Sequence, residues 1–108
     1  MKILLVEDAP EVQSVIVAIL EKAGHLVATE TNGNRAFRRY CKEGPYDLVL
    51  TDIEHKGMNG VELMHAIGKK NPKQNVQIIT GWPVLQKPFT RKQLLDFIKT
   101  PQLRAPLA

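Results

Sequence analysis

Cysteine is nearly absent from this chain, since Cys41 is the only one among its 108 residues. An intrachain disulfide is therefore excluded, which fits a protein of the reducing cytoplasm. No apolar run approaches the roughly 20 residues that a membrane-spanning helix needs. The N-terminus also lacks the long apolar stretch and the cleavage site of a secretory signal peptide. We therefore expect a cytoplasmic protein that does not contact a membrane.

Aromatic residues are also scarce, at 6% of the chain, although the formal net charge is +4. The positive residues are dispersed: eight of the fifteen fall in three segments, 35–39, 69–73 and 91–92, and the others are scattered along the chain. Nucleic-acid surfaces of the stacking type combine cations with several aromatic side chains, and this chain has few of them. We therefore expect no direct binding of nucleic acid. The cations belong either to solvated helix faces or to a surface that meets an acidic partner.

What the chain does have is a regular alternation of apolar patterns. Short, continuously apolar runs predict buried strands, and apolar residues at helical spacing predict helices between them. The predicted strands are residues 2–6, 25–30, 47–51, 76–80 and 84–86. The predicted helices run from Pro10 to the stop at Gly24, over 35–42, over 61–70 and onward from Thr90. Such alternation is typical of a parallel sheet covered by helices on both faces.

The length suits a single domain, residues 1–108, in which the tail at 101–108 is frayed. Asp8 stands where it could cap the first helix. Two helices have predicted inward-facing residues: Val12, Val15, Ile16, Ile19 and Ala23 in the first, and Val61, Met64 and Ile67 in the helix at 61–70.

Charged residues follow three of the predicted strands at the point where each strand ends. Glu7 and Asp8 follow the first strand, Asp52 the third and Lys87 the fifth. Because the carboxyl ends of parallel strands meet at one edge of a sheet, we expect these side chains to lie together. Carboxylates that close repel one another unless a cation neutralises them, and Mg²⁺ prefers oxygen ligands. The sequence therefore predicts a Mg²⁺-dependent phosphoryl site.

Four segments resemble the receiver domain of two-component response regulators, and the resemblance covers almost the whole chain. They are ILLVEDAPEV at 3–12, DLVLTDIEHKGMNG at 47–60, IITG at 78–81 and LQKPF at 85–89. Each segment is common by itself, but the four in this order, each at a predicted strand end, are specific. The resemblance implies a flavodoxin-like α/β fold, a doubly wound five-stranded parallel sheet of strand order 2-1-3-4-5.

The resemblance also implies a role for each site residue in a two-component phosphorelay. Asp52 would accept a phosphoryl group from a sensor histidine kinase or a histidine phosphotransfer protein. The Thr80 hydroxyl and the Lys87 ammonium would contact that group. The Mg²⁺ ligands would be the side chains of Glu7, Asp8 and Asp52 and the backbone carbonyl of Glu54. The chain would then be no enzyme beyond catalysing its own phosphorylation and dephosphorylation.

The chain departs from the family pattern in three places. Only six residues separate Thr80 from Lys87, which is too few for a strand and a helix. The helix between strands 4 and 5 is therefore missing, either because the chain naturally lacks it or because a segment is absent from the sequence. His55-Lys56 replaces the usual Met-Pro, and Val84 replaces the usual switch aromatic. The uncovered strand-5 edge would be the place for a partner or a second copy of the chain.

Two other classes of function remain to be weighed against the phosphorylated receiver. One is a phosphorylation-independent interaction module built on the same fold, and the presence of every site residue argues against it. The other is a hydrolase, which the absence of a nucleophile elbow and of a glycine-rich phosphate loop disfavours.

Overall fold

The fold is built around a parallel sheet. Its interior strand Lys2–Val6 is apolar and fully buried at every residue after Lys2. The computed structural model describes residues 1–52, 57–79, 91–93 and 95. Its strands are β1 (Lys2–Val6), β2 (Leu26–Glu30), β3 (Leu48–Asp52) and β4 (Val76–Ile79). They pair in parallel in the order β2-β1-β3-β4, which confirms the predicted order over the described strands. The predicted fifth strand at 84–86 and its edge lie outside the described residues.

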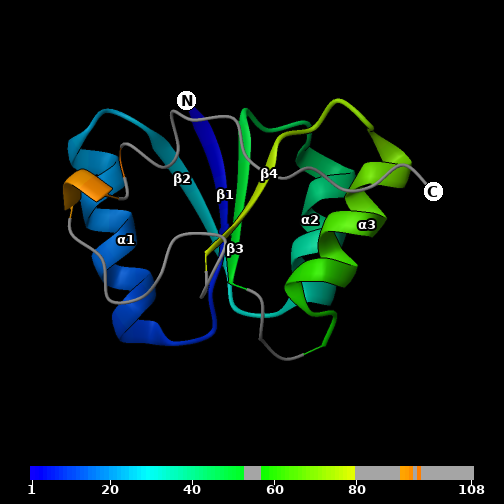
Figure 1. Ribbon diagram of the computed structural model, residues 1–108, viewed down its shortest axis with the longest axis horizontal. Helices are drawn as coiled ribbons and strands as arrows, with labels where there is room; N and C mark the ends of the chain where they lie inside the picture. The colour runs from blue at the N-terminus through cyan, green and yellow to red at the C-terminus, as the bar shows by residue number, and fades with distance from the viewer. Residues whose placement is uncertain (53–56, 80–90, 94, 96–108) are drawn as a thin grey trace.

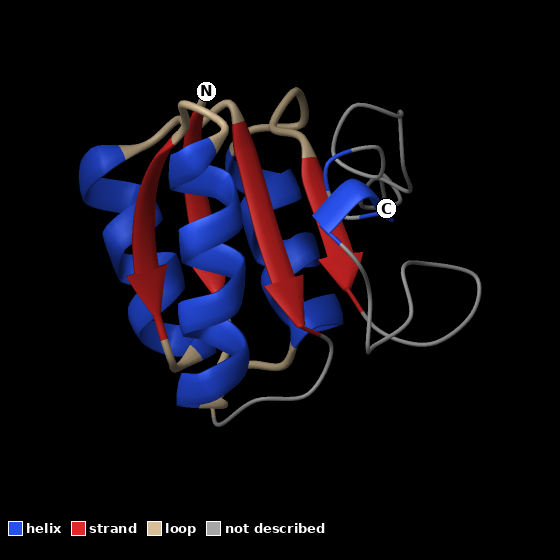
Figure 2. Ribbon diagram, turned by 90° about the vertical axis from the view of Figure 1, so that its left-hand side faces the viewer, coloured by secondary structure: helices blue, strands red, loops and turns tan. Residues whose placement is uncertain are grey.

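Three helices connect the strands and cover both faces of the sheet: α1 (Pro10–Lys22), α2 (Gly33–Glu43) and α3 (Gly60–Lys70). Helix α1 lies on one face, and α2 and α3 lie side by side on the other (Figure 1). The strands all point the same way, so their carboxyl ends share one edge (Figure 2). This is the doubly wound flavodoxin-like arrangement. Within the described residues, no helix has the length and apolar character needed to cross a membrane.

The apolar core forms two layers, one on each face of the sheet. Leu4 and Val6 of β1 belong to the layer under α2 and α3, whereas Ile3 and Leu5 belong to the layer under α1. This division follows from the alternation of side chains along a strand. Residues 91–93 and 95 are helical, as the sequence predicts, and Leu95 packs against the α1 layer. The tail at 101–108 lies outside the described residues.

The predicted inward faces of two helices need correction. Val15 of α1 is 56% exposed, and Leu20 is buried together with Ile16 instead. Val61 at the start of α3 is 40% exposed, while Leu63 joins the predicted Met64 and Ile67 in the core. Both errors have the same cause, because a segment that is apolar on several sides of the helix is compatible with more than one inward face.

The helix starts differ from the sequence-based expectation. Ala9, not Asp8, is the N-cap residue of α1, and no side chain caps that helix. Helix α2 begins at Gly33, two residues earlier than predicted, because the Asn32 side chain accepts hydrogen bonds from its first turn. Helix α3 begins with a capping box between Asn59 and Glu62.

A polar network ties α2 to the loops at the amino ends of the strands. The Gln74 Oε1 atom accepts hydrogen bonds from the Tyr40 hydroxyl (2.9 Å) and from the backbone N–H of Tyr46 (3.0 Å). The Tyr46 hydroxyl in turn donates to Glu43 Oε2 at 2.9 Å. These bonds satisfy polar groups that are buried at the end of the molecule opposite the predicted site.

Candidate functional site

Strand pairing places the acidic residues of β1 and β3 next to each other. Val6 is the partner of Thr51 in the β1–β3 ladder, so Glu7 and Asp52 follow at neighbouring positions of the same sheet edge. Glu7 continues the direction of its strand, because its backbone N–H donates to the Glu30 carbonyl at 3.0 Å. Asp8 is the next residue, at the turn into α1.

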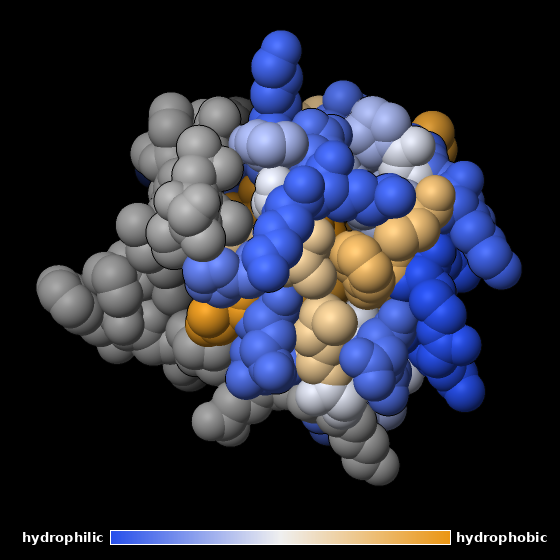
Figure 3. Space-filling model, turned by 90° about the vertical axis from the view of Figure 1, so that its right-hand side faces the viewer, coloured by the Kyte–Doolittle hydropathy of each residue, from blue (hydrophilic) through white to orange (hydrophobic). Residues whose placement is uncertain are grey.

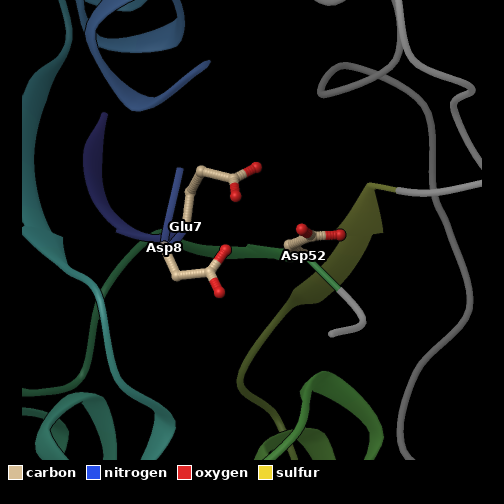
Figure 4. Close-up of side chains that lie close together, drawn as sticks. All are labelled: Glu7, Asp8 and Asp52. Carbon is tan, nitrogen blue, oxygen red and sulfur yellow. The ribbon is translucent and has the colours of Figure 1, made fainter. Parts of the chain in front are cut away.

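The carboxylates of Glu7, Asp8 and Asp52 form one cluster, which we call the acidic cluster. Each residue offers an oxygen, and these atoms all lie within 4.8 Å of one another. Figure 4 shows the side chains meeting from the ends of β1 and β3. Glu7 is 1% exposed, Asp52 is half-buried and Asp8 is open to solvent. The structure therefore brings together all three carboxylates that the sequence singled out.

This donor set fits a small divalent cation. Mg²⁺ takes oxygen ligands at about 2.0–2.1 Å, so two ligands on opposite sides of the ion are about 4.2 Å apart. The oxygens of the acidic cluster are already close to that separation. A cation here would also relieve the mutual repulsion of three carboxylates, one of them fully buried.

Backbone and side-chain hydrogen bonds hold Glu7 in place. The backbone N–H of Ala9 donates to Glu7 Oε2 at 3.2 Å, which orients the buried carboxylate. The side-chain amide of Gln13 in α1 donates to the carbonyls of Glu7 (3.1 Å) and Glu30 (3.4 Å). Gln13 thus links the carboxyl ends of β1 and β2 next to Glu7 of the acidic cluster. Sequence reasoning missed this residue, since a glutamine in a helix has no distinguishing pattern.

Gly57 lies against the start of α2, where a Cβ atom added to it would stand 2.7 Å from Asn32 Oδ1. Asn32 Oδ1 accepts from the backbone N–H groups of Asn34 (2.8 Å) and Arg35 (3.3 Å), which caps the helix. Asp8, Thr31, Asn32 and Arg35 line an open cleft of about 370 Å³ beside the acidic cluster.

Three of the predicted site residues, Glu54, Thr80 and Lys87, lie outside the described residues. Their predicted roles rest on the sequence alone.

Comparisons with known proteins agree with this architecture. The profile of the response regulator receiver domain matches residues 3–83. The response regulator receiver protein CpdR of Brucella abortus is 34% identical over 113 residues, which cover 91% of this chain and 93% of the relative. That alignment is longer than the whole chain, so CpdR carries residues within the matched span that this chain lacks.

Some relatives are much longer. The chain spans 24% of the length of the C4-dicarboxylate transport regulator DctD of Pseudomonas aeruginosa, at 27% identity over 91% of this chain. The match therefore concerns one domain of that protein.

Solved structures show the same fold. A response regulator receiver domain protein from Clostridium thermocellum superposes with a TM-score of 0.83 at 25% identity, covering 91% of this chain and 90% of the other. The receiver domain of the sensor histidine kinase PA1611 from Pseudomonas aeruginosa gives a TM-score of 0.81 at 26% identity, covering 92% and 98%, and holds a magnesium ion in its active site cleft. On the profile match and the identity to CpdR, the chain belongs to the response regulator receiver domain family.

Proposed function

We propose that this receiver domain accepts a phosphoryl group on Asp52 from a sensor histidine kinase or a histidine phosphotransfer protein. The observation that carries the proposal is the acidic cluster, in which Asp52 at the end of β3 lies within 4.8 Å of the carboxylate oxygens of Glu7 and Asp8. The magnesium-bound cleft of the PA1611 receiver domain supports the same interpretation. As part of a two-component pathway, the domain would work in the cytoplasm.

In the transfer step, a carboxylate oxygen of Asp52 forms a bond to phosphorus while the P–N bond of the phosphohistidine breaks. The electron pair of that bond goes to the imidazole nitrogen, and histidine leaves. Mg²⁺ on the acidic cluster, completed by the Glu54 carbonyl, would neutralise the carboxylates and hold the phosphoryl oxygens. Lys87 and Thr80 would contact the transferred group from the neighbouring strand ends.

The residues of the chain assist the phosphoryl transfer mainly by holding the nucleophile in place and by supplying charge. Asp52 is half-buried, so its reacting oxygen has limited freedom but remains accessible to a donor. Thr51 Oγ1 donates to the Asp52 carbonyl at 2.8 Å, which steadies the backbone of the nucleophile. Such positioning supplies most of the catalysis in phosphoryl transfer. The domain would act on no substrate other than its own aspartate.

The test is labelling of the purified chain by acetyl phosphate with and without Mg²⁺, read by intact-mass spectrometry. We expect one added phosphoryl group that requires Mg²⁺ and is lost in Asp52→Asn, because an amide is no nucleophile here. The matched control is Asp47→Asn, which changes an exposed aspartate at the opposite end of the same strand region. Labelling of Asp52→Asn at the wild-type level would assign the acceptor to another residue. A folded wild-type chain that takes no label would favour the phosphorylation-independent interaction module.

A further inference from the structure

The outward side of α2 carries a strong positive charge that the phosphorylation site does not use. Four cations stand on this helix, against the single acidic residue Glu43: Arg35, Arg38, Arg39 and Lys42. The helix buries Gly33, Ala36 and Tyr40 against the sheet, so the cations occupy the opposite side. Arg35, Arg38 and Lys42 are exposed.

Most of this charge is not balanced within the described part of the chain. Arg39 binds Glu30 Oε2 at 2.8 Å and lies 4.0 Å from Glu43. Among the described residues these are the ion pairs formed, and neither involves Arg38 or Lys42. Those two cations stand four residues apart, a spacing at which like charges oppose helix formation. The helix therefore tolerates an unfavourable arrangement that an acidic partner would relieve.

An apolar strip runs beside the cations. Because Arg39 reaches Glu30 of β2, the flank of α2 that carries Phe37 and Cys41 is turned the other way, toward α3. Phe37 is half-buried and Cys41 is exposed. Figure 3 shows apolar side chains gathered at the centre of this face, surrounded by hydrophilic ones.

The cations also line hollows on the surface. Glu30, Arg35, Arg38, Arg39, Lys42 and Glu43 surround a cleft of about 360 Å³. Arg35 lines this cleft and also the one beside Asp8. The positive surface therefore extends from the middle of α2 to the border of the acidic cluster.

We propose that the α2 basic face, defined by Arg35, Arg38 and Lys42 with the apolar strip of Phe37 and Cys41, docks an acidic amphipathic helix of a protein partner. The apolar side of such a helix would cover the strip, and its carboxylates would pair with Arg38 and Lys42. A nucleic acid fits less well, because its phosphate backbone has no apolar side to cover Phe37 and Cys41. Tyr40 is buried and Phe37 packs on the core, so neither offers a base-stacking platform.

The probe is a synthetic amphipathic peptide of about 18 residues, long enough to form a helix, with Leu on one side and Glu on the other. Its binding to the full chain is measured by fluorescence anisotropy, and the contact is mapped from backbone NMR shifts. We expect shifts concentrated on α2. The variant Arg38→Glu/Lys42→Glu should weaken binding at least about tenfold, because it replaces attraction with like-charge repulsion.

The matched control is Arg91→Glu/Lys92→Glu, which makes the same change of net charge at two exposed cations. Leu95 of the same helical segment packs against the α1 layer, so this pair belongs to the opposite face of the sheet. The control should change the affinity by no more than about twofold, as expected of distant surface charges. Equal losses in both variants would reduce the effect to net charge and overturn the proposal. A duplex DNA or an anionic phosphatidylserine vesicle that binds the same face more tightly than the peptide would overturn it as well.

Discussion

The backbone of Gly57 lies directly against the side chain of Asn32. A Cβ atom on Gly57 would stand 2.7 Å from Asn32 Oδ1 and 3.1 Å from Asn34 Nδ2. Gly57 also has a φ of +76°, in the left-handed region that favours glycine. Because Asn32 caps α2, Gly57 is held against the start of that helix.

Replacing Gly57 by alanine should therefore be costly. Gly57→Ala adds both backbone strain and a clash with Asn32 Oδ1, and we expect a loss of about 2 kcal/mol or more in the free energy of unfolding. Urea unfolding followed by circular dichroism measures this loss. The control is Gly24→Ala, where φ is +95° but no atom lies within 4 Å of the added Cβ. The unfolding free energy of that variant should fall by only about 1 kcal/mol, because it suffers backbone strain alone. Equal losses of unfolding free energy in the two variants would show that the contact with Asn32 does not contribute to the cost of Gly57→Ala.

Gln13 should matter for both stability and metal binding. Gln13→Ala removes the two hydrogen bonds from its side chain to the carbonyls of Glu7 and Glu30. We expect a loss of about 1 kcal/mol in unfolding free energy and an affinity for Mg²⁺ lowered about tenfold, because the buried ligand Glu7 loses its support. Calorimetric Mg²⁺ titration measures the second effect. Glu11→Ala, at an exposed position of the same helix, should leave the affinity unchanged. Unaltered Mg²⁺ binding in Gln13→Ala would limit this residue to a structural role.

The acidic cluster should destabilise the metal-free protein. Asp8→Asn removes one of three close negative charges, so without Mg²⁺ we expect the variant to be about 1 kcal/mol more stable than the wild type. Added Mg²⁺ should stabilise the wild type by mass action, by about 2.7 kcal/mol at a hundredfold excess over its dissociation constant. The variant should gain clearly less. Thermal unfolding at several Mg²⁺ concentrations gives both quantities. Asp47→Asn is the control for the Mg²⁺ response alone, because Asp47 Oδ2 accepts a hydrogen bond from the backbone N–H of Lys2 at 2.6 Å and the substitution changes the metal-free stability by itself. Equal Mg²⁺ responses in all three proteins would place the ion elsewhere.

Tyr46 should make the stability depend on alkaline pH. Burial, followed by its hydrogen bond to Glu43, raises the pKa of Tyr46 from 10.0 to about 12. Because the pKa of Tyr46 is higher in the folded state than in the unfolded state, the folded state favours the neutral side chain. This contribution is fully present below pH 10 and is lost as the pH rises toward 12. Tyr46→Phe should cost about 1 kcal/mol at neutral pH, through the lost hydrogen bond to Glu43, and should show a shallower decline at alkaline pH. Urea unfolding of the wild type and Tyr46→Phe is measured from neutral pH up to pH 12. If the unfolding free energies of the two proteins decline in parallel, Tyr46 is not the cause of the alkaline loss of stability.

The strands and their terminal acids could be predicted from the sequence because both depend on local patterns. Runs such as Ile3 to Val6 can be buried on both faces only as interior strands of a parallel sheet. Once those strands are parallel, the residues that follow them must share an edge, which is why Glu7, Asp8 and Asp52 were predicted together. The helix faces were less well determined, since α1 is apolar on several sides and the sequence favoured Val15 where packing selected Leu20.

Only the tertiary structure decided which residues support and surround the acidic cluster. Gln13 acts through carbonyls at the ends of two strands, and Asn32 meets Gly57 across the sheet edge, so neither contact leaves a periodic pattern in the sequence. The same holds for α2, where the pairing of Arg39 with Glu30 determines which flank of the helix faces α3. Local patterns specify which residues are buried, whereas contacts between distant segments depend on how the elements pack.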